Sequence, residues 1–235
     1  MGGDEHRDSI VRLYNKIAGV PFDWNNLPTG WHEFAEGVMF VDNAVGDKKG
    51  PGGTHYRKKS NRTQGWSWPD LNDAYSELRV GISDKNKFRR YGIIFHLFVD
   101  YCYLGGDLPT EYPRIRDEAS GVDIVYFHGK AFKTEVFKEE ILYPSYAAHQ
   151  RIDKSKMEEC LLHMPDEFTT VGRFAGTKAN WKEKVRSYYS TYSTLFSDGE
   201  LAFTPEELEE FTENAVTAFC DKYPEIITEL QSLTA

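Results

Sequence analysis

The chain has 235 residues, of which 28 % are charged and 40 % hydrophobic, and its formal net charge at pH 7 is −9. These proportions are typical of a globular protein, and the acidic balance argues against a general binder of duplex DNA, which would be repelled at long range. The charge does not exclude a small phosphate ester as substrate, because a bound cation would reverse the local field.

Cysteine usage and hydropathy bear on the compartment. The three cysteines form no C-x-x-C pair, which favours free thiols in a reducing environment. The first residues contain no apolar stretch typical of a signal peptide, and no window reaches the ~18 apolar residues that a membrane span needs. We therefore expect a cytoplasmic protein without a transmembrane segment; the sequence does not indicate its oligomeric state.

Helical spacing of apolar residues dominates the chain. It predicts a helix from Ser9 as N-cap to Gly19, a second over 30–46, and a long irregular loop at 46–69 whose aromatic residues, Tyr56 among them, pack onto the body. We expect further helices over 69–80, 91–104, 134–164 (interrupted or kinked at Pro144) and 180–196, and a last one from a capping box at Thr204. The stretch 121–132 fits a short strand or a loop, and we favour a loop or short helix.

These elements predict the fold class. We expect an all-α bundle of seven or eight helices, without a convincing sheet, that forms a single domain over 1–235. The helix over 91–104 is apolar on every side, which is typical of a central, buried helix.

Two polar side chains interrupt that central helix, His96 and Asp100, one turn apart on one face. A buried carboxylate is costly unless it is paired or bound to a cation. Three interpretations are open: a structural pair in which Asp100 accepts a hydrogen bond from His96 or another donor, a general-base dyad, or two ligands of a zinc-like ion.

A metal site needs ligands from several helices, and the chain offers more. Asp42 ends an apolar run, His55 lies in the loop that follows, and His149 with Asp153 repeats the H-x-x-x-D spacing. His32 is one more candidate and His128 a weaker one, whereas His6 is interpreted as a tail residue, His163 as a residue at a helix end and Cys102 as a core residue. A contiguous His-Asp doublet, which HD-type phosphohydrolases require, does not occur in the chain.

The order of these motifs resembles the all-helical, zinc-dependent phospholipase C-like proteins, in particular their small bacterial hydrolase branch. The matching pieces lie within residues 30–105: Gly37 to Asp42, Thr54-His55-Tyr56, Pro69-Asp70-Leu71, and Tyr91 to Tyr101 with His96 and Asp100. The wider superfamily includes phospholipases C and S1/P1-like nucleases, both built around clustered zinc ions.

The resemblance implies a metal-dependent hydrolase that cleaves a small phosphoester. Its metal ligands would be Asp42, His55, His96 and Asp100, with His149, Asp153 and His32 as further candidates for one to three Zn²⁺ ions. Asp42 or Asp100 would bridge ions or act as base, while Arg57 would meet the substrate phosphate and Trp66 its organic part. The alternative is a non-catalytic helical binding or regulatory protein with a structural or degenerate metal site.

Overall fold

The computed structural model describes residues 3–43, 55–56, 70–79, 86–103, 114–116, 120, 122–148, 153–166, 174, 182–183, 186 and 201–234. It is mostly helical, which confirms the predicted all-α class. The predicted loop at 46–69 and the predicted helix at 180–196 lie largely outside these residues. Among the described residues, no helix is both long and apolar enough to cross a membrane.

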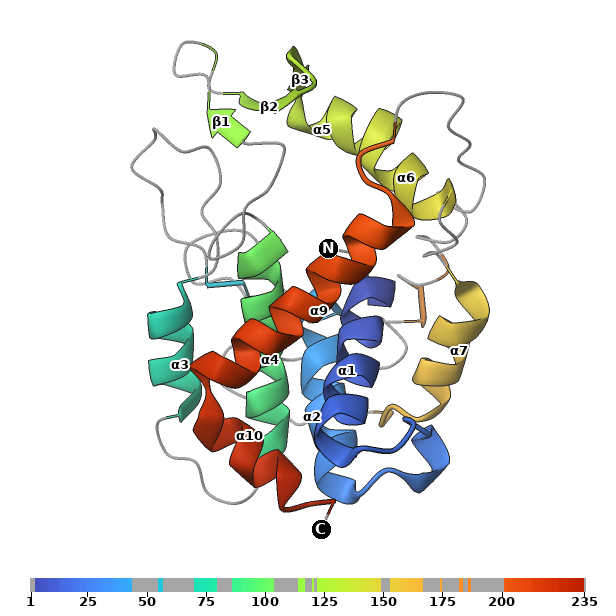
Figure 1. The fold of residues 1–235 in the computed structure, drawn as a ribbon, viewed down its shortest axis with the longest axis vertical. Coiled ribbons are helices and arrows are strands. Elements are labelled where there is room, and N and C mark those ends of the chain that lie inside the picture. Colours follow the sequence, from blue (N-terminus) through green and yellow to red (C-terminus); the bar gives the residue numbers. More distant parts are fainter. Residues whose placement is uncertain are drawn as a thin grey trace.

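The main body is a bundle of long helices, α1 (Gly3–Ala18), α2 (Thr29–Phe40), α4 (Lys87–Tyr103) and α9 (Pro205–Lys222) (Figure 1). Every residue from Tyr91 to Asp100 is buried, so the apolar helix predicted from the sequence is confirmed as a central element. Edge-to-face rings fill the space around it; the ring centroids of Phe95 and Phe219 are 4.8 Å apart. Shorter elements surround the bundle: α3 (Leu71–Arg79), α7 (Lys154–Leu162), α10 (Pro224–Gln231), η1 (Trp24–Asn26) and η2 (Val41–Asn43).

Helices α2 and α4 touch backbone to backbone because each has a glycine at the crossing. A Cβ atom on Gly37 would lie 1.9 Å from the carbonyl oxygen of Arg89, and one on Gly92 would lie 2.0 Å from that of Phe34. No side chain fits at either position without separating the helices. The close approach brings the end of α2 against the polar residues of α4.

A second, smaller apolar cluster lies at the end of the molecule opposite α10 (Figure 1). It includes an antiparallel sheet of β1 (Arg114–Arg116), β2 (Asp123–Phe127) and β3 (Lys130–Lys133). The prediction of a loop or short helix at 121–132, and of no sheet, was therefore wrong. Strands β2 and β3 join through His128 and Gly129, both with positive φ (45° and 75°), as the tightest hairpin turns require.

Proline shapes the helical segments beside this sheet. Helices α5 (Thr134–Phe137) and α6 (Tyr143–Ala148) are separated by a π-helical turn, η3 (Lys138–Leu142). Pro144 lacks the N–H that would continue an α-helical ladder, so the predicted interruption is confirmed. The side chain of Phe211 on α9 packs against both apolar clusters. The prediction of one domain over 1–235 stays a prediction.

One predicted helix end is found in the structure, and two others differ from the prediction. The capping box at Thr204 is confirmed, since the Thr204 hydroxyl accepts from the backbone of Glu207 and the Glu207 carboxylate accepts from that of Thr204. The last predicted helix is broken at Pro224, which begins α10. The prediction of Ser9 as an N-cap was wrong, because α1 begins at Gly3 and the Ser9 hydroxyl donates to the carbonyl of Glu5 inside the helix.

Candidate metal centre

Five side chains from four segments converge beside α4. Their ligand atoms form two groups, His6 with His96 and Asp100, and Asp42 with His55 and His96, and within each group all ligand atoms lie within 4.8 Å of one another. His96 belongs to both groups, so the five residues make one continuous cluster. Buried His and Asp groups are thus placed to hold a metal ion.

His96 is the central member of the cluster, and its orientation is fixed by α2. Its Nδ1 lies 2.8 Å from the carbonyl oxygen of Val38, which can only accept, so Nδ1 carries the proton. Burial lowers the pKa of His96 to about 3, which keeps the ring neutral at pH 7. The other nitrogen, Nε2, therefore presents a bare lone pair to the interior of the cluster.

That lone pair has no hydrogen-bond donor among the described residues. His96 Nε2 is buried without a hydrogen-bond partner among the described residues, and Asp100 Oδ2 lies 3.7 Å from it. An acceptor facing a carboxylate is unfavourable unless a proton or a cation lies between them. A hydrogen bond from His96 to Asp100 does not fit this geometry, whereas one from another donor, His6, is consistent with it. In a dyad, Asp100 would not be the residue that orients the His96 ring.

His6 covers one face of His96. The two rings are stacked with centroids 3.6 Å apart and an interplanar angle of 16°, and His6 Nε2 lies 3.4 Å from Asp100 Oδ1. Only 1 % of His6 is exposed, so its interpretation as a tail residue was wrong. It lies one turn before Ile10 on the same buried stripe of α1. Extending the apolar spacing of that helix backwards by one turn would have found it.

His55 lies between the two carboxylates. Its Nε2 is 3.4 Å from Asp42 Oδ1 and 3.5 Å from Asp100 Oδ2. The following residue, Tyr56, anchors this segment because its ring is buried and its carbonyl accepts from the backbone N–H of Asp70. The expectation that Tyr56 packs onto the body is confirmed. This packing holds the His55 imidazole 5.6 Å, centroid to centroid, from that of His96.

The two carboxylates are ionised at neutral pH. Burial alone would raise the pKa of Asp100, but a side-chain hydrogen bond from His6 contributes to holding it well below its usual range. The pKa of Asp42 is also lowered: burial raises it, but a hydrogen bond from His55 and the charges of the neighbouring imidazoles together outweigh that effect. A third of the Asp42 side chain is exposed (33 %), whereas that of Asp100 is 6 % exposed. Solvent therefore meets the cluster on its Asp42 side.

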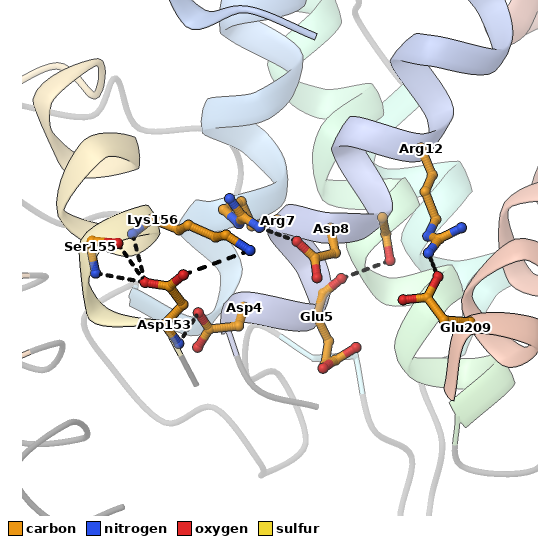
Figure 2. A network of polar contacts seen from close by, with 10 residues as sticks. Asp4, Glu5, Arg7, Asp8, Arg12, Asp153, Ser155, Lys156 and Glu209 are labelled. Atoms are coloured by element: carbon orange, nitrogen blue, oxygen red, sulfur yellow. Dashed lines mark hydrogen bonds and ion pairs between the residues drawn. The ribbon is translucent and has the colours of Figure 1, made fainter. Parts of the chain in front are cut away.

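The start of α1, which carries His6, is tied to α7 (Figure 2). The buried Asp4 carboxylate accepts from the backbone N–H of Asp153 at 3.2 Å. Asp153 is itself the N-cap of α7, and its carboxylate accepts from the backbones of Ser155 and Lys156. Asp153 is therefore a helix cap and belongs to neither ligand group. The H-x-x-x-D spacing had predicted a metal ligand at this position.

The remaining predicted site residues fall elsewhere. His32 belongs to neither ligand group and lies near Trp24 and His163. His128 is exposed in the β2–β3 turn, while Cys102 is fully buried in the core and His163 follows the last residue of α7, both as predicted. Outside the described residues lie His149, Arg57 and Trp66.

Comparisons of the chain with models of protein families, with curated proteins and with solved structures found no match.

Proposed function

We propose that the chain is a metal-dependent hydrolase whose centre is formed by His6, Asp42, His55, His96 and Asp100. The observation that carries the proposal is the bare, buried Nε2 of His96 facing the carboxylate of Asp100. A divalent cation between them would convert an unfavourable contact between acceptors into two coordinate bonds. The Val38 carbonyl on Nδ1 is the kind of outer contact that orients metal-binding histidines.

The donor set favours zinc. Three imidazoles and two carboxylates supply the nitrogen and oxygen ligands that Zn²⁺ takes in proteins, whereas Mg²⁺ and Ca²⁺ prefer oxygen alone. The order of motifs that resembles zinc-dependent phospholipase C-like proteins supports the same ion. The proposal concerns a small phosphoester as substrate, because the cluster would present positive charge to a phosphate oxygen once a cation is bound.

A bound Zn²⁺ lowers the pKa of a coordinated water from 15.7 to about 7, which supplies a nucleophile at neutral pH. The chain's own residues would have distinct roles. Asp42, which lies on the solvent side, would accept a proton as general base. His55 holds Asp42 and Asp100 in position, and the His6 ring excludes water from one face of His96.

A second candidate function rests on a specific observation. Four of the five donors are at most 5 % exposed, and a closed set of four ligands is typical of structural zinc sites. In that case the ion would hold α1, α4 and the His55 segment together, and the chain would be a non-catalytic binding or regulatory protein.

A substrate screen separates the two candidates. Zinc-reconstituted protein would be assayed against chromogenic phosphomonoesters, phosphodiesters and phosphocholine esters, beside an Asp42→Asn variant that keeps the four buried donors. The hydrolase proposal expects turnover that falls at least ~100-fold in the variant while zinc stays bound. Bound zinc without turnover of any ester would favour the structural site.

A further inference from the structure

A second set of imidazoles lies outside the candidate centre, where three segments meet. His32 is in the first turns of α2, His163 follows α7, and Trp24 is the first residue of η1. The rings of Trp24 and His163 are nearly parallel (6°) with centroids 5.3 Å apart. The centroids of His32 and His163 are 6.2 Å apart, and both imidazoles are partly exposed.

The separation of the two imidazoles suits a shared ion. With metal–nitrogen bonds of 2.0–2.1 Å, two imidazoles bound to one ion have ring centroids at most about 6.4 Å apart. The 6.2 Å between His32 and His163 falls within this limit, and a small side-chain rotation would shorten it to a bent arrangement. The stacked indole of Trp24 limits how the His163 ring can tilt.

The chemistry around the pair also favours a cation. His32 donates one ring N–H to the backbone carbonyl of Trp24, which leaves its other nitrogen as an acceptor. The exposed carboxylate of Asp23 interacts with His163 and adds negative charge beside it, while its oxygens cap η1. A pair of imidazoles beside a carboxylate is a typical environment for copper and zinc.

We propose that His32 and His163 form a peripheral binding site for a divalent transition-metal ion such as Cu²⁺ or Zn²⁺. The ion would join the end of α7 to the start of α2 beside the buried indole of Trp24. This site shares no residue with the buried cluster, and it stands whether or not the buried cluster is catalytic.

The test uses Cu²⁺ alone as the probe, added to full-length protein that has first been saturated with zinc and freed of excess by dialysis against a weak chelator. Cu²⁺ quenches nearby tryptophan fluorescence, so binding at this site should quench Trp24. We expect one equivalent of Cu²⁺ to bind with quenching, and electron paramagnetic resonance to report two nitrogen ligands. His32→Gln and His163→Gln should each weaken binding about tenfold or more.

His128→Gln is the matched control, because His128 is an exposed histidine in the β2–β3 turn. It should bind Cu²⁺ as the wild type does. Trp24→Phe should keep the bound Cu²⁺ but lose most of the quenching, which would place the ion beside η1. Unchanged Cu²⁺ affinity in both His32→Gln and His163→Gln would overturn the proposal, as would an equal loss in His128→Gln.

Discussion

Helices α2 and α4 hold two buried polar groups, and the two groups are built differently. Near the start of α4, the guanidinium of Arg89 donates through Nε (2.9 Å) and Nη2 to the Glu36 carboxylate, and through Nη1 to Asn86 at 2.5 Å. One to two turns further along the same helix, His96 presents an acceptor to a carboxylate. The first group is electrically complete within the protein, whereas in our proposal the second would be completed by a cation.

The difference shows how a buried charge can be told from a ligand. Glu36 and Arg89 balance donor against acceptor, so the pair is explained by structure alone. The His96 and Asp100 group contains two acceptors and a tautomer fixed by Val38. Burial and charge alone would not separate the two cases; the direction of the hydrogen bonds does.

Breaking the ion pair between Glu36 and Arg89 should have the largest effect on the unfolding free energy. Arg89→Met would leave the Glu36 carboxylate buried without its main donor, which costs about 3–5 kcal/mol of unfolding free energy. Chemical denaturation should show this loss equally with and without added zinc. The double variant Glu36→Leu/Arg89→Met should recover most of the stability, and a double variant as unstable as Arg89→Met would contradict this account of the pair.

Separating the two helices should affect both groups. Gly37→Ala or Gly92→Ala would place a methyl group against backbone and cost about 1–3 kcal/mol. The same variants should weaken zinc binding, because the Val38 carbonyl would move away from His96. Gly30→Ala is the matched control, since its added methyl would meet only the side chains of Leu233 and Phe88. Zinc affinity unchanged in both crossing variants would argue against the orienting role of Val38.

Removing a helix N-cap should cost less unfolding free energy and should not affect zinc binding. Asp153→Ala removes the N-cap of α7 and should cost about 1 kcal/mol, as Thr204→Ala should at α9. Zinc content, measured by elemental analysis, should stay at the wild-type value in both variants. A loss of zinc in Asp153→Ala but not in Thr204→Ala would indicate that Asp153 is a metal ligand.

Replacing Asp100 by a side chain that can donate a hydrogen bond to His96 should have the smallest effect on the unfolding free energy of the metal-free protein. In Asp100→Asn the amide can donate to His96 Nε2, so the apo protein should change by less than about 1 kcal/mol, in either direction. The variant should lose the rise in melting temperature that zinc gives the wild type. Calorimetry with and without zinc measures both effects, and a strongly destabilised apo variant would contradict the view that the contact between His96 and Asp100 is unfavourable without an ion.

The sequence predicted the central helix and its two polar residues because both follow from local composition. Tyr91 to Asp100 is apolar on every side, and a carboxylate in such a segment demands a partner. Asp42 and His55 were added by their position beside apolar runs and by the family resemblance. His6 was missed because Ser9 was interpreted as a cap, which placed the start of α1 too late.

Other features depend on contacts that one segment does not encode. The pairing of Glu36 with Arg89 depends on how α2 and α4 cross. The need for glycine at positions 37 and 92 likewise follows from the close approach of the two backbones at that crossing. The β2–β3 hairpin was missed because its strands are short and its turn uses His128 before Gly129. With His149, Asp153 repeats the spacing of His96 and Asp100, but its position at the start of α7 makes it a cap.

The most direct test of the metal centre is the zinc content of untagged protein, measured by plasma mass spectrometry after reconstitution and dialysis. The wild type should retain at least one equivalent, and a His96→Ala/Asp100→Ala variant of unchanged helical content should retain none at this centre. Arg89→Met, which disturbs the complete pair on the same helices, should keep its zinc. A folded wild type that retains no zinc, or a double variant that retains as much as the wild type, would contradict the assignment.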